Sequence, residues 1–406
     1  MAFQAASGRA ARRARASRLP STSRGRAGPS MTEHNRQELD PPADTAPRDE
    51  SAAPPEMPRQ KRADDPGVQA ALDALIAEVA GRECDAFDAR LVRDLMTAAL
   101  KLIPDGRDTG ELKLMTAAVK ELRYAFRVFG QYARPHKVSI FGSARTPETH
   151  PDYAAAVEFG RLMAEAGWMA ITGAGDGIMK AGHVGPGRGA SFGVAIRLPF
   201  ETTANDVIAG DEKLIHFRYF FTRKLMFLSQ AEAVALFPGG FGTLDEAYET
   251  LTLVQTGKAS MIPIVLVEGE RGPGAPSYWA QFDRFVREAL LAGGFISPED
   301  LNLYTIAATP REGVEHVLRF YRTYHSSRYV RDTFVIRLQR PLHRRDVERL
   351  NDEFGVLVRK GRIEPCGPFD AEDDHLDLPR LAFVHTRHKF GLVRALIDRI
   401  NEFEPE

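Results

Sequence analysis

A glycine-rich loop with a hydroxyl group and two carboxylates stands at residues 237–246, whose sequence is FPGGFGTLDE. It follows an apolar run and precedes a segment with helical spacing that Gly257 would end. Four of the five residues at 238–242 are glycine or proline, more than the start of a helix requires. Such a loop lets backbone amides bind an anion beside a hydroxyl group. The candidate anion-binding residues are Gly239, Gly240, Phe241, Gly242 and Thr243.

The acidic residue that closes this loop, Glu246, has two alternative roles. Thr243 stands where an N-cap is expected, and Thr243-x-x-Glu246 has the spacing of a capping box. A capping box would give Glu246 a structural role that contributes about 1 kcal/mol to stability. In the alternative, the carboxylate faces the anion site and takes part in the chemistry there.

Two adjacent cations lie on the segment that leads into the same strand. Residues 220–227 read FFTRKLMF, so Arg223 and Lys224 belong to an otherwise aromatic and apolar helix. One interpretation is a basic pair that faces solvent. In the other, Arg223 points at a phosphate or at Glu246, because a cation among apolar residues needs a partner. Lys224 is then a second candidate ligand of the phosphate.

Two further loops at predicted strand ends are candidate sites. Residues 140–145, IFGSAR, combine a sharp turn with a hydroxyl group and a guanidinium, and residues 172–180, TGAGDGIMK, place three glycines before a helix. The second loop fits neither the Walker A pattern nor the dinucleotide-binding fingerprint. For both loops the alternative is a tight turn without a ligand. The candidate binding residues are Gly142, Ser143, Arg145, Gly173, Gly175 and Gly177.

These loops require a fold that brings strand ends together. Between residues 135 and 325, short β-rich apolar runs alternate with helical segments. That alternation predicts an α/β domain with a parallel sheet and helices on both faces. Ligands of such sheets bind at the carboxyl ends of the strands, which is where the three loops lie. The predicted strands are Val138–Phe141, Trp168–Thr172, Phe192–Leu198, Ala233–Phe237, Ile262–Val267 and Leu303–Ile306.

The rest of the chain divides into three parts. We expect residues 1–66 to be disordered, with residues 1–30 either a transit peptide or, as we favour, an extension before a start at Met31. Residues 67–134 have helical spacing and predict a lead-in of three helices. Residues 326–406 predict a small α+β accessory domain in the order β-α-β-β-α. Its predicted elements are Thr333–Leu338, Arg345–Val358, Arg362–Cys366, Leu381–His385 and Phe390–Asn401.

Composition excludes several classes of protein. The 406 residues have a net charge of −1, but seven arginines and no acids at 1–30 leave a net charge of −8 for the remainder. An acidic body argues against nucleic-acid binding. No apolar run is long enough to span a membrane. Two cysteines fit the reducing cytoplasm and no closed zinc site. We therefore expect no metal. We also expect no cofactor, because nothing in the sequence marks one lysine for a Schiff base with pyridoxal phosphate.

Taken together, the motifs resemble the LOG family. These "Lonely Guy"-type nucleoside 5′-monophosphate phosphoribohydrolases are often labelled lysine decarboxylases. The resemblance rests on PGGFGTLDE at 238–246 and TRKLM at 222–226, and on SIFGSAR, ITGAG and IRLPFE at 139–145, 171–175 and 196–201, which resemble the longer bacterial branch. It implies a Rossmann-like fold and hydrolysis of an N-glycosidic bond to a free base and ribose 5-phosphate. The implied substrates are purine nucleotides, with AMP or a cytokinin-type ribotide as candidates.

The resemblance also implies roles for single residues. Gly240, Gly242 and Thr243 match the family's phosphate-binding loop. Arg223 and Glu246 match its essential pair and are therefore the predicted catalytic residues. A carboxylate near the ribose would stabilise the positive charge that develops as the bond breaks, and would orient water. The family works as a dimer with residues of both subunits near the site, so we expect a homodimer with a shared site.

Three positions depart from the family pattern. The expected GPGIMEA is GDGIMKA at residues 175–181, so Asp176 replaces a proline and Lys180 replaces an acid. His183 stands where an asparagine is expected. These changes alter the charge of a loop that should face the ligand. They motivate a second hypothesis, a non-catalytic nucleotide-binding sensor or carrier with the same fold.

Overall fold

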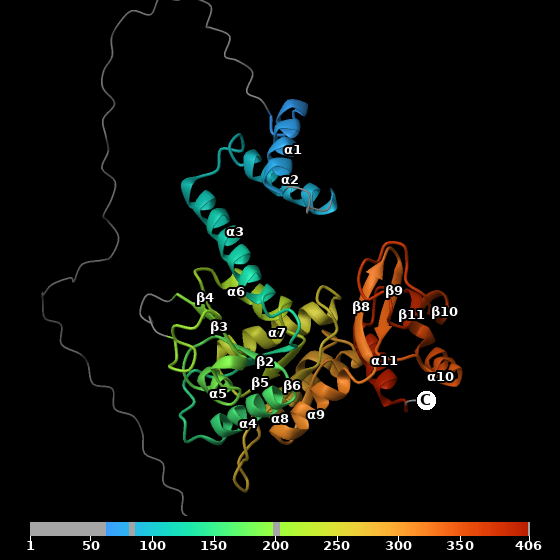
Figure 1. Ribbon diagram of the computed structural model, residues 1–406. Coiled ribbons are helices and arrows are strands. Elements are labelled where there is room, and N and C mark those ends of the chain that lie inside the picture. The colour runs from blue at the N-terminus through green and yellow to red at the C-terminus, as the bar shows by residue number, and fades with distance from the viewer. Residues whose placement is uncertain (1–61, 81–85, 198–203, 405–406) are drawn as a thin grey trace, which may run out of the picture.

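The computed structural model describes residues 62–80, 86–197 and 204–404, and Figure 1 shows two sheets side by side, the larger one with helices on both faces. The helices are α1 (Pro66–Ala80), α2 (Ala86–Lys101), α3 (Thr109–Gly130), α4 (Pro151–Glu165), α5 (Ile178–Val184), α6 (Phe220–Ser229), α7 (Phe241–Gln255), α8 (Tyr278–Phe285), α9 (Pro310–Phe320), α10 (Arg344–Phe354) and α11 (Phe390–Glu402). The strands are β1 (Lys137–Phe141), β2 (Met169–Thr172), β3 (Ser191–Ile196), β4 (Leu214–Phe217), β5 (Ala233–Leu236), β6 (Ile264–Val267), β7 (Thr305–Ala307), β8 (Tyr324–Val330), β9 (Thr333–Leu338), β10 (Val358–Cys366) and β11 (Arg380–His385). None of the helices in the described ranges is long and apolar enough to cross a bilayer. Of the segment predicted to be disordered, residues 1–61 lie outside the described ranges.

The larger sheet has seven parallel strands in the order β4-β3-β2-β1-β5-β6-β7. The chain builds outward from β1 to β4 and then returns to place β5 on the other side of β1. At this switch point the loops after β1 and β5 lead to helices on opposite faces, which leaves a crevice between them. The predicted α/β class and the parallel sheet are confirmed.

Two hydrophobic cores lie on opposite faces of the sheet. On one face, α4, α5 and α9 bury residues such as Phe159 and Val317 against the strands. On the other, α3, α6, α7 and α8 bury residues such as Phe129, Phe227 and Trp279. Helices cover both faces, as predicted, and the two helices that follow the switch point, α4 and α7, belong to different faces.

Most of the predicted strands occur within two residues of their predicted bounds. The strand predicted at Leu303–Ile306 begins only at Thr305, because residues 298–303 form a 3₁₀ helix. Strand β4 was not predicted. Its four residues, LIHF, lie at the sheet edge and include a histidine, so they form too short a run to give a β pattern.

The C-terminal domain has one strand more than predicted. Its order is β-β-α-β-β-α, and its antiparallel sheet runs β10-β11-β9-β8. Strand β8 was missed because YHSSRYV is mostly polar, as an edge strand allows. The helix predicted at Arg345–Val358 ends at Phe354, since a short 3₁₀ turn leads directly into β10 at Val358 rather than at Arg362.

This domain packs directly onto the helical face that carries α7. Residues of β8, β9 and α11 share one hydrophobic core with α6, α7 and α8. Gly257, which follows α7 with a φ of +67°, makes the contact close, because a Cβ there would lie 2.2 Å from the Phe390 ring of α11. The C-terminal end of α7 is thereby held by the second domain.

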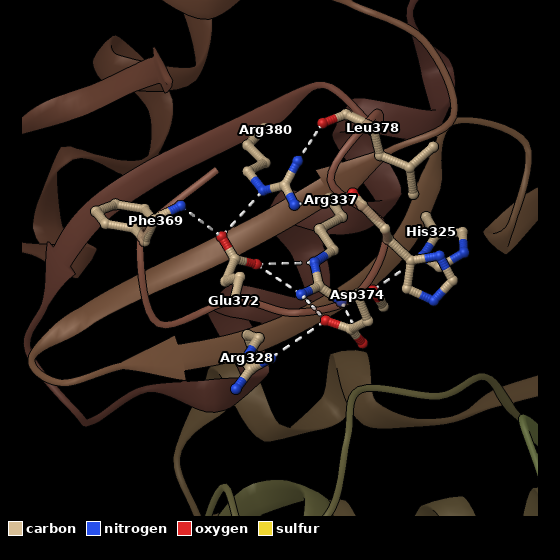
Figure 2. A network of polar contacts seen from close by, with 10 residues as sticks. His325, Arg328, Arg337, Phe369, Glu372, Asp374, Leu378 and Arg380 are labelled. Carbon is tan, nitrogen blue, oxygen red and sulfur yellow. Dashed lines mark hydrogen bonds and ion pairs between the residues drawn. The ribbon is translucent and has the colours of Figure 1, made fainter. Parts of the chain in front are cut away.

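A buried ion network fixes the loop between β10 and β11 (Figure 2). Glu372 on this loop is buried and accepts hydrogen bonds from Arg337 of β9 at 2.6 Å and from Arg380 of β11 at 3.1 Å. Arg337 also reaches the half-exposed Asp374 at 2.6 Å. Because both guanidinium groups are buried, moving the loop away from the sheet would take the Glu372 carboxylate from two buried cations.

We predict that Glu372→Ala destabilises the protein by roughly 3–5 kcal/mol, because the buried Arg380 loses its carboxylate partner and the buried Arg337 keeps only the half-exposed Asp374. Asp374→Ala is the matched control and should cost about 1 kcal/mol or less, since that carboxylate is half-exposed. Urea unfolding followed by circular dichroism measures both. Equal losses for the two variants would contradict the network.

Candidate active site

A cavity of about 540 Å³ lies at the carboxyl edge of the larger sheet, at the switch point. The three glycine-rich loops predicted from the sequence all contribute to its wall, together with α6. The predicted site residues that line it are Gly142, Ser143, Arg145, Gly173, Arg223, Gly240, Phe241, Gly242, Thr243 and Glu246. The predicted residues that do not line it are Gly175, Gly177, Lys224 and Gly239.

The N-terminus of α7 opens into this cavity. The helix begins at Phe241, its N-cap is Gly240, and no side chain of the capping residue bonds the first turn. An uncapped first turn leaves amide donors and the positive end of the helix dipole for an anion. Thr243 is therefore the third residue of the helix and not its N-cap, so the predicted capping box is wrong. The signal for it was the Thr-x-x-Glu spacing, but the glycines let the helix start three residues earlier.

Glu246 lies in the second turn of α7, where its buried carboxyl faces the cavity. Burial raises its pKa to about 7, against the opposing effect of the Lys224 and Arg223 charges. A carboxyl group with this pKa exchanges a proton near neutral pH, which suits general acid–base chemistry.

Arg223 of α6 lies across the cavity from this carboxyl group. Its guanidinium packs between the rings of Phe220 and Phe227, at 5.2 and 5.4 Å from their centroids. Nη2 is 3.9 Å from Glu246 Oε1, too far for a hydrogen bond, and the buried Nε has no partner among the residues that the structure describes. Burial lowers the pKa of Arg223, and Glu246 opposes this. The side chain thus has hydrogen-bonding capacity that an anion would satisfy.

Lys224 connects α6 to α7 outside the cavity. Its ammonium lies 2.8 Å from Asp245 and 2.7 Å from Glu249. It does not line the cavity, so in the structure it holds the two helices that carry Arg223 and Glu246. Among the neighbouring charges it has the largest effect on the pKa of Glu246, which it lowers.

The glycines of the other loops allow main chains to touch. A Cβ at Gly177, which has a φ of +61°, would lie 2.3 Å from the Ser143 carbonyl oxygen, and a Cβ at Gly142 would lie 2.5 Å from Ile178. The Ser143 amide donates to Pro238 O at 3.1 Å, and the Ile178 amide donates to Ser143 O at 3.0 Å. The first loop is therefore wedged between the other two. Most of these glycines serve packing, and few amides of the first two loops remain for a ligand.

Gly239 has a similar role in the third loop. A Cβ there would lie 2.1 Å from Thr243 Oγ1, and its carbonyl accepts a hydrogen bond of 2.7 Å from the Tyr278 hydroxyl. Gly175 lies against Met179 and its carbonyl accepts from Asn205 at 2.9 Å. These residues shape the wall of the cavity from behind.

The residues that depart from the family pattern do not line the cavity. Lys180 pairs with Glu148 and Asp206, at 2.9 and 3.2 Å. His183 is fully buried, and its Nε2 lies 2.9 Å from Thr172 Oγ1. The side chains of Lys180 and His183 are thus engaged with other residues of the domain, whereas Asp176 is exposed.

Several cavity residues had no recognised signal in the sequence. Phe141, Ala144, Met179, Phe220, Phe227 and Asp245 also line the wall. The aromatic residues looked like ordinary core positions, and only the position of α6 beside α7 brings them to the cavity. In the described parts of the chain, no group of three or more histidine, cysteine or acidic residues could hold a metal ion.

Comparisons with known proteins add the following. Residues 175–317 match a family model described as "Possible lysine decarboxylase". No match was found among curated proteins. The molybdenum cofactor carrier protein from Chlamydomonas reinhardtii is 20% identical over 46% of this chain and 98% of its own, with a TM-score of 0.31. The molybdenum cofactor binding protein from Rippkaea orientalis is 21% identical over 45% and 94%, with a TM-score of 0.31. DNA processing protein A from Helicobacter pylori is 11% identical over 48% and 83%, with a TM-score of 0.32.

We predict that Glu246→Gln stabilises the fold at pH 8 by roughly 1–3 kcal/mol. The carboxyl pKa rises from 4.5 to about 7 on folding, so ionisation costs the folded state free energy. That cost grows as the pH rises from the unfolded-state pKa to the folded-state pKa, and it stays constant at higher pH. Thermal unfolding should show the gain at pH 8 and its loss at pH 4, where both side chains are neutral. A variant less stable than the parent at pH 8 would mean that Glu246 has a structural role.

Proposed function

Because the α/β domain belongs to the LOG family, we propose that this protein hydrolyses the N-glycosidic bond of nucleoside 5′-monophosphates. The products are a free base and ribose 5-phosphate. The observation that carries the proposal is the arrangement of Arg223 and Glu246, which face one cavity from two neighbouring helices. Arg223 Nη2 lies 3.9 Å from Glu246 Oε1, near the uncapped start of α7.

The 5′-phosphate is proposed to bind at the start of α7. Amides of the first turn and the Thr243 hydroxyl lie on one side of this position, and the Arg223 guanidinium, whose Nε has no partner in the described part of the chain, lies on the other. A dianion there gains from the helix dipole and from a desolvated cation. Arg145, exposed at the rim, is the remaining cation of the lining.

Glu246 is then proposed to act at the ribose. As the bond from C1′ to the base breaks, positive charge develops on the ribose ring, and a nearby carboxylate stabilises it. The same carboxylate accepts a proton from the attacking water, whose oxygen bonds to C1′ as the bond to the base breaks. That proton then passes to the leaving base, which restores the carboxylate. The aromatic residues around Arg223 keep water from screening these charges.

The base is proposed to be a purine, with AMP and cytokinin-type ribotides as candidate substrates. Met179, Phe220 and Phe241 give the cavity apolar surface on which a flat ring can stack. A purine has two fused rings and buries more surface there than a pyrimidine. We propose the reducing cytoplasm as the place of this reaction.

A second copy of the chain is proposed to complete the site. Phe241, at the mouth of the cavity, is 94% exposed, and Phe220, Phe221 and Leu225 of α6 are about half-exposed. Apolar side chains at such positions favour association. Light scattering that gives the mass of a single chain at all concentrations would contradict the dimer.

We expect purified protein to release free base from AMP or GMP, and less from CMP or UMP, as measured by chromatography. Glu246→Gln should lower kcat by at least about 100-fold, because the charge that stabilises the transition state is lost. Glu165→Gln is the control, since that carboxylate lies on the exposed face of α4. Lysine is incubated in parallel because of the description of the matched family, and no carbon dioxide should be released from it.

No free base from any nucleotide, at micromolar protein over hours, would contradict the proposal. Calorimetry with AMP then separates the remaining hypothesis. Binding without turnover would support a nucleotide sensor or carrier.

We predict that kcat/KM rises with pH through an apparent pKa near 7, because the ionised Glu246 is the active form. Lys224→Met removes the charge that most lowers this pKa, so the rise should move to higher pH. Lys224→Arg keeps the charge and should leave the midpoint near that of the parent. The measurement is kcat/KM for AMP between pH 5 and 9. A midpoint that does not move in Lys224→Met would exclude Glu246 as the titrating group.

A further inference from the structure

The loop at the start of α7 is held by a residue that lies outside the cavity. Gly239, between β5 and α7, has a carbonyl oxygen that accepts a hydrogen bond of 2.7 Å from the Tyr278 hydroxyl. Tyr278 is the first residue of α8, the helix that follows β6, and it does not line the cavity. A part of the domain outside the three glycine-rich loops therefore contacts the main chain of the candidate site.

The position of the Tyr278 hydroxyl is fixed by the start of α8. The side chain of Ser277 caps this helix, and the Glu268 carboxylate accepts a hydrogen bond of 2.9 Å from the Tyr278 amide. The ring of Tyr278 meets the fully buried ring of Trp279 edge-on, with centroids 4.8 Å apart. A hydroxyl whose main chain and ring are both held in this way can fix the position of a more flexible partner.

That partner is the peptide group between Gly239 and Gly240. In a planar trans peptide, the carbonyl and the next amide point in opposite directions. Tyr278 draws the Gly239 carbonyl to its own side, so the Gly240 N–H points to the other side. Gly240 lines the cavity, and its amide donates to no acceptor within residues 62–80, 86–197 and 204–404. The amide is therefore available to an anion at the start of α7.

Glycine by itself does not maintain this orientation. Turning the peptide over would change the φ of Gly240 from −90° to about +90°, which glycine adopts readily and other residues rarely adopt. The turned peptide would present the Gly239 carbonyl oxygen to the cavity, where its partial negative charge repels an anion. The chain must therefore select the orientation by a contact from outside the loop, and the Tyr278 hydroxyl makes that contact.

We propose that Tyr278 is a positioning residue that keeps the Gly240 N–H directed into the cavity and thereby sets the affinity of the site for a phosphate group. Tyr278 acts through the peptide and does not itself touch the ligand. The inference rests on the phosphate site proposed above, but it does not depend on hydrolysis of a glycosidic bond.

The test measures binding of ribose 5-phosphate to the full chain by calorimetry, because this probe carries the phosphate and has no base to release. Tyr278→Phe removes the hydroxyl, keeps the ring and should raise the Kd at least about five-fold. Tyr321→Phe is the matched control. Its hydroxyl donates a hydrogen bond of 2.6 Å to the carbonyl of Glu232, at the opposite end of β5. This control should lose a similar amount of thermal stability and leave the Kd within about two-fold.

Gly240→Ala tests the orientation of the peptide directly. A Cβ at this position meets nothing within 4 Å, and a φ of −90° suits alanine, whereas the turned peptide does not. In the Gly240→Ala background the peptide should keep its orientation without the hydroxyl, so Tyr278→Phe should raise the Kd less than about two-fold. Comparing the two backgrounds cancels any direct effect of the new methyl group on the ligand.

Turnover of AMP gives a second readout. The phosphate is bound alike before and during the reaction, so Tyr278→Phe should raise KM at least about five-fold and leave kcat within about two-fold. A fall of kcat with an unchanged KM would overturn the proposed role, because it would place the effect of Tyr278 on the chemical step.

The binding outcomes decide the rest. A Kd that does not change in Tyr278→Phe would overturn the inference, and so would an equal rise in Tyr321→Phe, which would indicate general destabilisation. An equal effect of Tyr278→Phe in both backgrounds would exclude the orientation of the peptide as its cause. If ribose 5-phosphate does not bind the parent chain, the inference fails. If it binds and the variants behave as expected while no nucleotide releases its base, the proposed reaction fails and the role of Tyr278 stands.

Discussion

The candidate site depends on one buried pair of opposite charges that the fold holds close together, without a hydrogen bond between them. Arg223 and Glu246 approach to 3.9 Å, the Arg223 Nε has no partner within the described ranges, and burial raises the pKa of Glu246 to about 7. A pair joined by two short hydrogen bonds would be satisfied and chemically idle. Here both groups remain able to respond to a bound anion and to a proton. Burying these two charges without a full set of hydrogen bonds costs free energy. Packing elsewhere in the domain offsets that cost.

The fold maintains this pair by placing it on two helices that other contacts hold in position. Lys224 clamps α6 to α7 through Asp245 and Glu249, just outside the cavity. Behind the loops, glycines let main chains meet, so that Ser143 donates to one neighbouring loop and accepts from the other. The start of α7 is fixed by these contacts rather than by a capping side chain, and its amides stay free for a ligand.

The C-terminal domain extends this support to the far end of α7. Phe390 packs over Gly257 at the end of the helix, and the buried network of Glu372 with its two arginines keeps the β10–β11 loop in place. The same arrangement leaves a second cavity between the two domains, lined by other residues of α6 and α7.

The sequence alone determined the α/β class, the positions of most strands of the larger sheet, and which three loops contribute to the wall of the cavity. These features are local, because hydrophobic period and glycine-rich loops can be read without knowing what lies nearby. Strands β4 and β8 were missed because their short or polar edge sequences pair only where a neighbouring strand is present. The capping box at Thr243 was wrong because spacing does not reveal where a helix starts once glycines permit an earlier turn. Only the tertiary structure decided that Lys180 and His183 lie away from the cavity, that Lys224 acts as a clamp, and that Glu246 is desolvated, since burial and pKa depend on atoms from distant parts of the chain.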